Sequence, residues 1–417
     1  MHTSSPTAPA TGWDAHYEFK AVALLALGFG LVGLDRFIIH PLFPVMQKDL
    51  GLDYRDLGLI SAALALTWGI ASVWAGRLAD RIGRKRVLVP SIVLFSVLVA
   101  MSGLATGLVS LLLIRALMGL AEGAYVPASI IATTEASKPT RTGLNVGIQQ
   151  MAAPLVGLGL GPLVALGLLN VLPSWHWVFG VVAIPGLIVA ALIAKVLRDV
   201  VPVRQQQEVV QSPPWGQTLK HRAVIVNTLA MMCYLTCLIT LSAFMPNYLT
   251  DHVGLSLDQM GLVLAGIGVG SCAGMVVVPA VSDKVGRKPV IVAALLIELL
   301  AIGALIAVAR APGELFAALF VATFMNAGVV AINVGPLTSG SVPPHLVATA
   351  TGIVVGLGEI VGGAIAPAVA GALAHSMGIT VIPLIALASV AVGLMVVVFG
   401  VREPEKRDWR LRGSPLV

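Results

Sequence analysis

The 417-residue chain is 57% hydrophobic and only 11% charged, and its mean hydropathy is +0.94. These values exclude a soluble globular domain and predict an all-α protein that crosses a membrane many times. In a soluble protein the net charge of +6 would suggest a nucleic-acid partner, but here we expect a lipid bilayer around the chain and no nucleic acid. The three cysteines lie in apolar runs without metal-ligand spacing, so we predict neither a metal site nor a cofactor.

In chain order, a polar N-terminal tail (1–19) without the features of a signal peptide comes first. Twelve apolar stretches follow, each long enough to cross a hydrocarbon core about 30 Å thick. They lie at 20–44, 56–76, 87–106, 108–131, 142–168, 175–197, 223–249, 257–280, 289–309, 314–338, 346–373 and 378–401. We therefore predict twelve transmembrane helices.

The basic residues indicate which way the chain crosses the membrane. If alternate loops lie on alternate sides, only Lys48, Arg55 and Arg310 face one side. The rest of the 26 Lys and Arg residues face the other side, apart from Arg36 and Arg115 within the spans. Cytoplasmic loops carry such an excess of basic residues. We predict a multi-pass protein of the cell (inner) membrane with both termini in the cytoplasm.

A polar segment at the midpoint of the chain, residues 198–222, contains three consecutive glutamines and a Pro-Pro pair. This composition is typical of a linker between domains. We predict an N-terminal six-helix bundle (20–197), a cytoplasmic linker (198–222), a C-terminal six-helix bundle (223–401) and a cytoplasmic tail (402–417).

An internal repeat supports this division. The loop Gly76-Arg-Leu-Ala-Asp80-Arg81-Ile-Gly83-Arg84-Lys85 follows the second span, and Pro279-Ala-Val-Ser-Asp283-Lys-Val-Gly286-Arg287-Lys288 follows the eighth. The two copies are 203 residues apart (from 80 to 283), and two upstream glycines recur in the same register: Gly51 and Gly58 as Gly254 and Gly261. Parallel repeats of this kind form transporters with a substrate site between the halves.

These repeated loops are candidate gating loops. Their glycines permit tight turns, their aspartates can cap a helix or pair with a base, and their basic clusters anchor the loops to the cytoplasmic side. The candidates are Gly76, Asp80, Arg81, Gly83, Arg84, Asp283, Gly286 and Arg287. A topology anchor without a gating role is the alternative.

Four ionisable residues lie inside predicted spans: Asp35 and Arg36 in the first, Arg115 and Glu122 in the fourth. Each costs several kcal/mol at membrane depth, so we expect them to be used. From the span directions, Asp35, Arg36 and Arg115 share one depth, and Glu122 lies roughly 10 Å deeper. We predict an ion pair between Asp35 and Arg115, with Glu122 within reach of Arg36.

The gating-loop pattern Gly-x-x-x-Asp-Arg-x-Gly-Arg-Lys resembles the signature of the major facilitator superfamily. Within it, Asp35-Arg36 followed by Pro41 and Pro44, with Arg115-x-x-x-Gly119-x-x-Glu122-Gly123-x-x-x-Pro127, resembles the anion:cation symporter family. That family contains proton-coupled sugar-acid transporters and vesicular glutamate transporters. The resemblance implies proton-coupled symport of a small organic anion by alternating access. Glu359 departs from it, since a sugar-acid carrier leads us to expect a neutral polar residue there.

The four charges suit this chemistry. Guanidinium binds carboxylates through a planar fork and stays charged, and its movement changes the proton affinity of neighbouring carboxylates. We expect Arg36 and Arg115 to bind the substrate carboxylate, and Asp35 and Glu122 to take the coupled protons. The alternative is a structural network that holds the two spans together. The positions 203 residues after Asp35, Arg115 and Glu122 are apolar, which confines this charge to one half.

Other polar residues in the spans are further candidates for the substrate site: His40, Gln149, Gln150, Asn326, Asn333 and Glu359. Each alone is also explained by an interhelical hydrogen bond. Glu359 is the strongest because it is ionisable, and Asn333 follows because the adjacent Gly335-Pro336 can open the helix. Glu298 also lies within a predicted span, the ninth, and the sequence gives no physical account of it.

A proton-driven exporter of drugs or metabolites is the main alternative on the same fold. Such an exporter needs a large apolar cavity, and two arginines inside the spans make an apolar cavity unfavourable. The partial antiporter motif Gly157-x-x-x-Gly161-Pro162 lacks its following glycine pair. No His-Glu-x-x-His or Gly-x-Ser-x-Gly motif is present, so we predict no enzyme. We expect a monomer whose partners are a small organic anion, protons and lipid.

Overall fold

The computed structural model describes residues 14–198, 215–307, 310–343 and 346–401, apart from the side chains at 73, 75–77, 80 and 215. These residues are almost entirely helical and contain no β-strand, so the predicted all-α fold class is confirmed. Residues 1–13 of the predicted N-terminal tail, the predicted C-terminal tail and most of the predicted linker lie outside the described residues. The first helix begins at Ala15, inside the predicted N-terminal tail.

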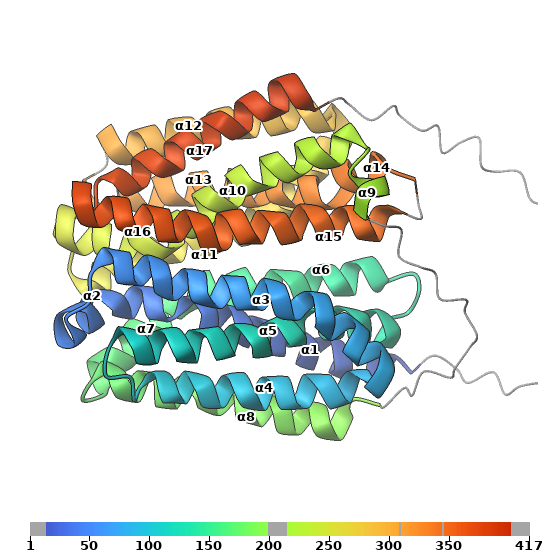
Figure 1. The fold of residues 1–417 in the computed structure, drawn as a ribbon, viewed down its shortest axis with the longest axis horizontal. Helices are drawn as coiled ribbons and strands as arrows, with labels where there is room; N and C mark the ends of the chain where they lie inside the picture. The colour runs from blue at the N-terminus through green and yellow to red at the C-terminus, as the bar shows by residue number, and fades with distance from the viewer. Residues whose placement is uncertain (1–13, 199–214, 308–309, 344–345, 402–417) are drawn as a thin grey trace, which may run out of the picture.

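Two groups of helices lie side by side (Figure 1). Here η marks a π-helical segment. The N-terminal half contains α1 (Ala15–Phe37), α2 (Ile39–Leu50), α3 (Tyr54–Ile82), α4 (Arg84–Ser102), α5 (Leu108–Ala136), α6 (Thr142–Ala153), η1 (Pro154–Leu160), α7 (Gly161–Val171) and α8 (Trp175–Val196). The C-terminal half contains α9 (Trp215–Thr218), α10 (Arg222–Asn247), η2 (Tyr248–Val253), α11 (Leu257–Val285), α12 (Arg287–Ala307), α13 (Pro312–Ile332), η3 (Asn333–Leu337), α14 (Thr338–Gly340), α15 (Val347–Gly358), η5 (Glu359–Ile365), α16 (Ala366–Met377) and α17 (Val381–Gly400).

Eleven helical segments of the described chain are long and apolar enough to cross a membrane. α3, a helix of 29 residues between the first and second of them, occupies the place of the second predicted span. The twelve predicted spans therefore have helical counterparts. Several are built from consecutive helices, such as α1–α2 and α15–η5–α16, because π segments and prolines interrupt them without ending the crossing.

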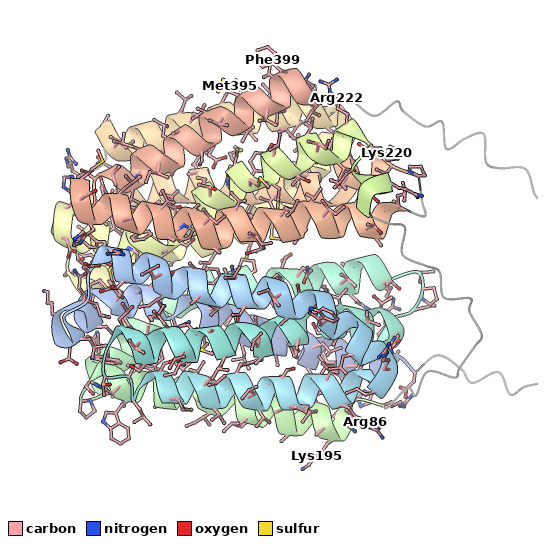
Figure 2. All side chains as sticks on the ribbon, in the orientation of Figure 1. Arg86, Lys195, Lys220, Arg222, Met395 and Phe399 are labelled. Carbon is pink, nitrogen blue, oxygen red and sulfur yellow. The ribbon has the colours of Figure 1, made fainter. Side chains whose placement is uncertain are left out.

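The outside of the bundle is apolar, and one end is basic. Phe399 of α17 is 79% exposed and points outward, as a lipid-facing side chain does (Figure 2). Arg86, Lys195, Lys220 and Arg222 lie at one end of the bundle, which we name the basic end. The opposite end, where α2, α7 and α16 lie (Figure 1), we name the α2 end.

Corresponding helices begin with the same turn in both halves. α2 ends at Gly51 (φ +63°) and η2 ends at Gly254 (φ +80°), two left-handed positions that favour glycine. Asp53 then caps α3 through the N–H of the residue three further on (2.9 Å), and Ser256 caps α11 in the same way (3.3 Å). Since both pairs are 203 residues apart, the register of the repeat holds in three dimensions.

The two halves meet closely at two helix crossings. A β-carbon on Gly58 of α3 would lie 2.3 Å from the carbonyl oxygen of Pro367 of α16. One on Gly268 of α11 would lie 1.9 Å from the backbone nitrogen of Gly159 in η1. These glycines let the backbones touch, as small residues do between membrane helices.

Polar contacts between the halves also concentrate at the α2 end. They are Tyr54 to Asp251 (2.8 Å), Asn247 to Gln47 (2.8 Å), Asn170 to Asp258 (3.0 Å) and the ion pair of His375 with Asp53 (3.0 Å). Toward the basic end, α6 and α15 make no extensive contact across the interface in the described residues. The halves are therefore held together mainly at the α2 end.

Candidate functional site

Arg36 is positioned by an interruption of the first predicted span. α1 ends at Phe37 and α2 begins at Ile39, and Pro41 lacks the N–H that would bond to the carbonyl of Phe37. Arg36 therefore lies in the last turn of α1, where the carbonyl end of a helix favours a cation.

Arg115 of α5 binds the backbone of α1. Its Nη1 donates to the carbonyl oxygens of Asp35 (2.9 Å) and Arg36 (3.4 Å). The predicted ion pair between Asp35 and Arg115 is wrong, since none is found among the described residues. The last carbonyls of a helix lack partners within it, and the guanidinium satisfies these instead.

Two glycines bring α5 against α3. A β-carbon on Gly119 would lie 2.3 Å from the carbonyl oxygen of Leu64, and one on Gly123 would lie 2.4 Å from that of Trp68. This close approach buries Glu122 completely, and neither of its carboxylate oxygens has a hydrogen-bond partner among the described residues. Glu122 lies within electrostatic range of Arg36 and Arg115. The close packing of α5 thus places an unpaired carboxyl group near both arginines.

Arg36 forms an ion pair with Glu359, which is the first residue of η5 in the other half. Arg36 Nη2 lies 2.9 Å from Glu359 Oε2, and the two side chains are 15% and 13% exposed. Its guanidinium also lies 5.5 Å from the ring centroid of Phe37 and 5.8 Å from that of Trp68. Arg36 therefore pairs with Glu359, a contact that was not predicted, while Glu122 lies within electrostatic range of it, in line with the predicted reach.

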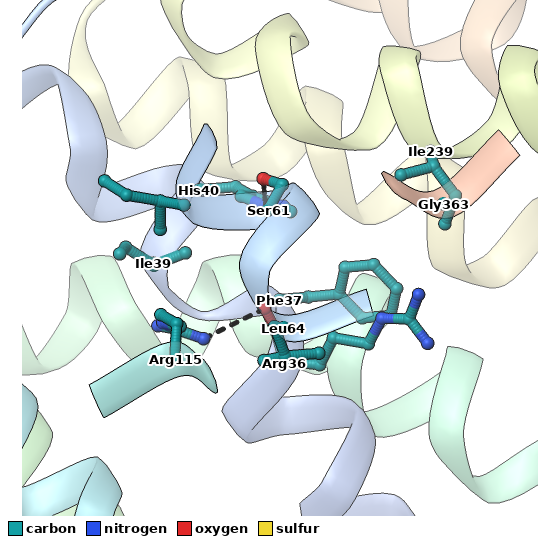
Figure 3. A pocket seen from close by; sticks show the side chains of 10 residues that line it. Arg36, Phe37, Ile39, His40, Ser61, Leu64, Arg115, Ile239 and Gly363 are labelled. Carbon is teal, nitrogen blue, oxygen red and sulfur yellow. Dashed lines mark hydrogen bonds between the residues drawn. The ribbon is translucent and has the colours of Figure 1, made fainter. Parts of the chain in front are cut away.

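Both arginines line one small pocket of about 310 Å³, counting its open mouth. The lining residues are Arg36, Phe37, Ile39, His40, Ile60, Ser61, Leu64, Arg115, Ile239 and Gly363. Figure 3 shows the Arg36 side chain extending toward Ile239 and Gly363, whereas Arg115 lies on the opposite side of α1. The pocket is thus formed by both halves and carries its positive charge on the N-terminal one.

Of the neutral candidates, His40 is the one that reaches this pocket. Its Nε2 lies 3.4 Å from Ser61 Oγ, and its Nδ1 is buried without a partner in the described residues. Gln149 binds Ser129 (2.8 Å) on α5. Gln150 is half-buried on α6, and neither glutamine lines the pocket.

The candidates of the C-terminal half, apart from Glu359, hold helices of that half together. Asn333 Nδ2 donates to the carbonyl of Asn227 (2.9 Å), and Asn326 Nδ2 donates to Glu298 (2.8 Å). The backbone of Gly335 (φ −86°, ψ −106°) departs from helical values, as predicted for an opening beside Asn333. Glu298, for which no role was predicted, also accepts from the thiol of Cys237 (3.3 Å), so it joins three helices.

The repeated loops have matching geometry. Gly83 (φ +98°) and Gly286 (φ +118°) form the turns that follow α3 and α11, which confirms the predicted tight turns. Arg84 bridges to Glu135 (3.1 Å), and Arg287 pairs with Asp283. Arg81 is exposed at the end of α3, and the side chains at positions 76 and 80 lie outside the described set.

Sequence reasoning missed several pocket residues. Phe37, Ser61 and Ile239 are neutral residues within apolar stretches, and they carry no signal that separates them from packing residues. Trp68 differs, because a tryptophan in a span facing a buried arginine suggests a cation–π contact once the facing helices are known.

The helices and the pocket define a polytopic membrane protein with a pocket between two similar halves, the arrangement found in transporters. The family model of the Major Facilitator Superfamily matches residues 25–256 and 228–416, and the chain belongs to this superfamily. It is therefore a solute transporter and not an enzyme. The predicted superfamily is confirmed.

Known proteins similar to this chain include two bacterial transporters. The hexuronate transporter of Bacillus subtilis is 30% identical over 275 residues, which cover 62% of this chain and 64% of that protein. The 3-(3-hydroxy-phenyl)propionate transporter of Escherichia coli is 27% identical over 322 residues, covering 76% and 77%. The fold matches the crystal structure of an inward-facing bacterial homologue of the human lysosomal transporter Spinster (TM-score 0.73, 16% identity, 93% and 96% coverage).

Proposed function

We propose that this protein is a proton-coupled symporter of a small organic anion, such as a sugar acid, an aromatic acid or another mono- or dicarboxylate. Arg36 and Arg115 bind the substrate carboxylate, and Asp35 and Glu122 take the coupled protons. The similarity to transporters named for hexuronate and hydroxyphenylpropionate, both carboxylates, supports this substrate class.

The proposed anion-binding site rests mainly on one observation, the unpaired donors of Arg115. Arg115 is only 1% exposed and lines the pocket, yet its Nε and Nη2 have no hydrogen-bond partner in the described part of the chain. Buried donors of a charged group are costly to leave unpaired. A carboxylate in the pocket supplies the missing acceptors and the opposite charge.

The balance of charge supports proton coupling. Arg36 and Arg115 carry two positive charges, whereas Asp35, Glu122 and Glu359 carry three negative charges when all are ionised. An anion entering this set makes it more negative, and uncompensated charge in a buried site is strongly unfavourable. Protons on the carboxylates restore neutrality, so the anion and the protons favour each other's binding.

We further propose the cell membrane as the location and the cytoplasm as the side of the basic end, following the positive-inside rule. In this orientation, the contacts at the α2 end hold the halves together on the outer side. His40, Gln149, Gln150 and Asn333 remain proposed substrate contacts, of which His40 has support from the pocket.

Uptake into proteoliposomes tests this function. Purified protein is reconstituted, and labelled glucuronate or 3-(3-hydroxyphenyl)propionate is supplied outside at acidic pH with an alkaline interior. We expect accumulation above the outside concentration, abolished by a protonophore. Gradient-driven movement in the opposite direction would support the exporter, and absence of movement for every carboxylate supplied would refute an anion carrier.

The proton-coupling residues give a separate prediction. In Asp35→Asn and Glu122→Gln, we expect counterflow exchange of the labelled anion to persist, whereas accumulation driven by a pH step falls at least tenfold. Each substitution removes a proton acceptor but keeps the shape of the side chain. Glu314→Gln, an exposed position at the start of α13, is the matched control. Accumulation at the wild-type level in both variants would contradict this assignment.

A further inference from the structure

The Arg36–Glu359 ion pair joins the two halves beside the pocket. Arg36 belongs to α1, and Glu359 opens η5, which packs against α3 and α10. Gly363, one turn after Glu359, lines the pocket, and a β-carbon on it would lie 2.5 Å from Glu359 Oε2 and 3.6 Å from Arg36 Nη2. The absence of a side chain at Gly363 makes room for the pair.

The carboxylate of Glu359 therefore binds Arg36 as a substrate carboxylate would. We propose that Glu359 is an internal competitor of the substrate anion and the acceptor of one coupled proton. This rests on the proposed anion site at Arg36. An arriving carboxylate replaces Glu359 on the guanidinium, and the released Glu359 takes up one proton from the buffered solution.

The proton is required by the environment of Glu359. Its side chain is 13% exposed. The glycines beside it, Gly358, Gly362 and Gly363, pack against apolar or backbone groups: Ala65 of α3, and Met231, Leu235 and the backbone of Thr236 of α10. A carboxylate released here finds no other cation in the described part of the C-terminal half near η5. A buried charge without a partner is neutralised by protonation.

Other ionisable groups lie on the N-terminal side of the pair. They are Asp35, His40, Arg115 and Glu122. Arg115 is bound to the end of α1, so it stays in place when Glu359 leaves. Asp35 and Glu122 also make anion binding depend on pH. The contribution of Glu359 is the part of this dependence that is lost when Glu359 is replaced.

The exchange also links substrate binding to the contact between the two halves. Because Arg36 and Glu359 come from opposite halves, their ion pair ties the halves together at the pocket. A bound anion breaks this ion pair, whereas the crossing of Gly58 with Pro367, at the α2 end, is unaffected. Substrate and proton together therefore loosen one specific link in the interface.

The test measures binding of glucuronate and 3-(3-hydroxyphenyl)propionate to the full-length protein in nanodiscs by calorimetry, from pH 5.5 to 8. In two buffers of different ionisation enthalpy, the same titrations give the number of protons taken up per anion. For each proton coupled to binding, affinity rises about tenfold per unit fall in pH. We expect Glu359→Gln to take up about one proton fewer per anion than the wild type and to bind the anion at least tenfold more tightly at pH 8.

Two further variants sharpen the outcome. Glu359→Asp keeps the carboxyl group and is expected to keep the proton uptake, and Glu314→Gln is the control for a Glu-to-Gln change outside the pocket. If Glu359→Gln kept the wild-type proton uptake, or bound the anion more weakly at every pH while remaining folded, the inference would be overturned and the anion site would stand. If the wild type bound neither anion at any pH, the proposed function would fail and this inference with it.

Discussion

Replacement of Arg36 by alanine is expected to reduce anion binding by about 2–5 kcal/mol, which abolishes uptake at ordinary substrate concentrations. Arg36 is the pocket cation that is partly exposed and points toward the other half, so it is the guanidinium that an entering carboxylate meets (Figure 3). Arg36→Lys keeps the charge but loses the planar fork, and we expect an intermediate loss. The measurement is uptake per amount of folded protein.

A control is needed because Arg36→Ala also leaves Glu359 without its partner. Removing one member of a buried ion pair destabilises proteins by about 3–5 kcal/mol. The double variant Arg36→Ala/Glu359→Gln removes the unpaired charge, so we expect its thermal stability to recover while uptake stays absent. Arg310→Ala, at an exposed position outside the pocket, is the matched control for loss of an arginine. Uptake by the double variant near the wild-type rate would show that Arg36 does not bind the anion.

The repeat was the most reliable sequence signal. The register of 203 residues predicted matching turns, and Gly83 and Gly286 have positive φ values in corresponding places. Such a signal works because a left-handed turn restricts the residue type, so the constraint is visible in the sequence itself. The gating role proposed for these loops remains a prediction.

The pairing of the buried charges could not be predicted from the sequence. Depth along a helix places Asp35 and Arg115 at one level, but depth does not say which way each side chain points. Because α1 is interrupted after Phe37, backbone carbonyl oxygens at its end lack helical partners, and Arg115 binds these instead of a carboxylate. The partner of Arg36, Glu359, lies 323 residues away in the sequence. Whether η5 faces α1 depends on how the two halves pack together.

The glycine crossings give a second prediction with a large effect. Gly58→Ala is expected to push apart α3 and α16 at the α2 end, because the new β-carbon would lie 2.3 Å from the carbonyl oxygen of Pro367. Overpacking of this kind typically costs about 1–3 kcal/mol. Gly268→Ala, at the crossing of α11 with η1, is expected to have the same effect, since its β-carbon would meet the backbone of Gly159.

This cost falls only on the conformation in which the halves touch at the α2 end. A penalty of about 1–3 kcal/mol in one of two conformations changes their ratio by roughly 5- to 150-fold. We therefore expect both variants to populate a state that is open at the α2 end, and to transport slowly because the return to the closed state is disfavoured. The fold itself should persist, because each half keeps its own helix contacts.

The measurement is the distance between spin labels at Lys48→Cys and His252→Cys, two exposed positions at the α2 end on opposite halves, after replacement of the three native cysteines. The distance is expected to lengthen in Gly58→Ala and Gly268→Ala. Gly69→Ala is the matched control on α3, because the nearest atom to its β-carbon is Ile360 Cγ1 at an ordinary 3.9 Å. Identical distance distributions in Gly58→Ala and Gly69→Ala would show that the glycine crossing does not hold this end closed.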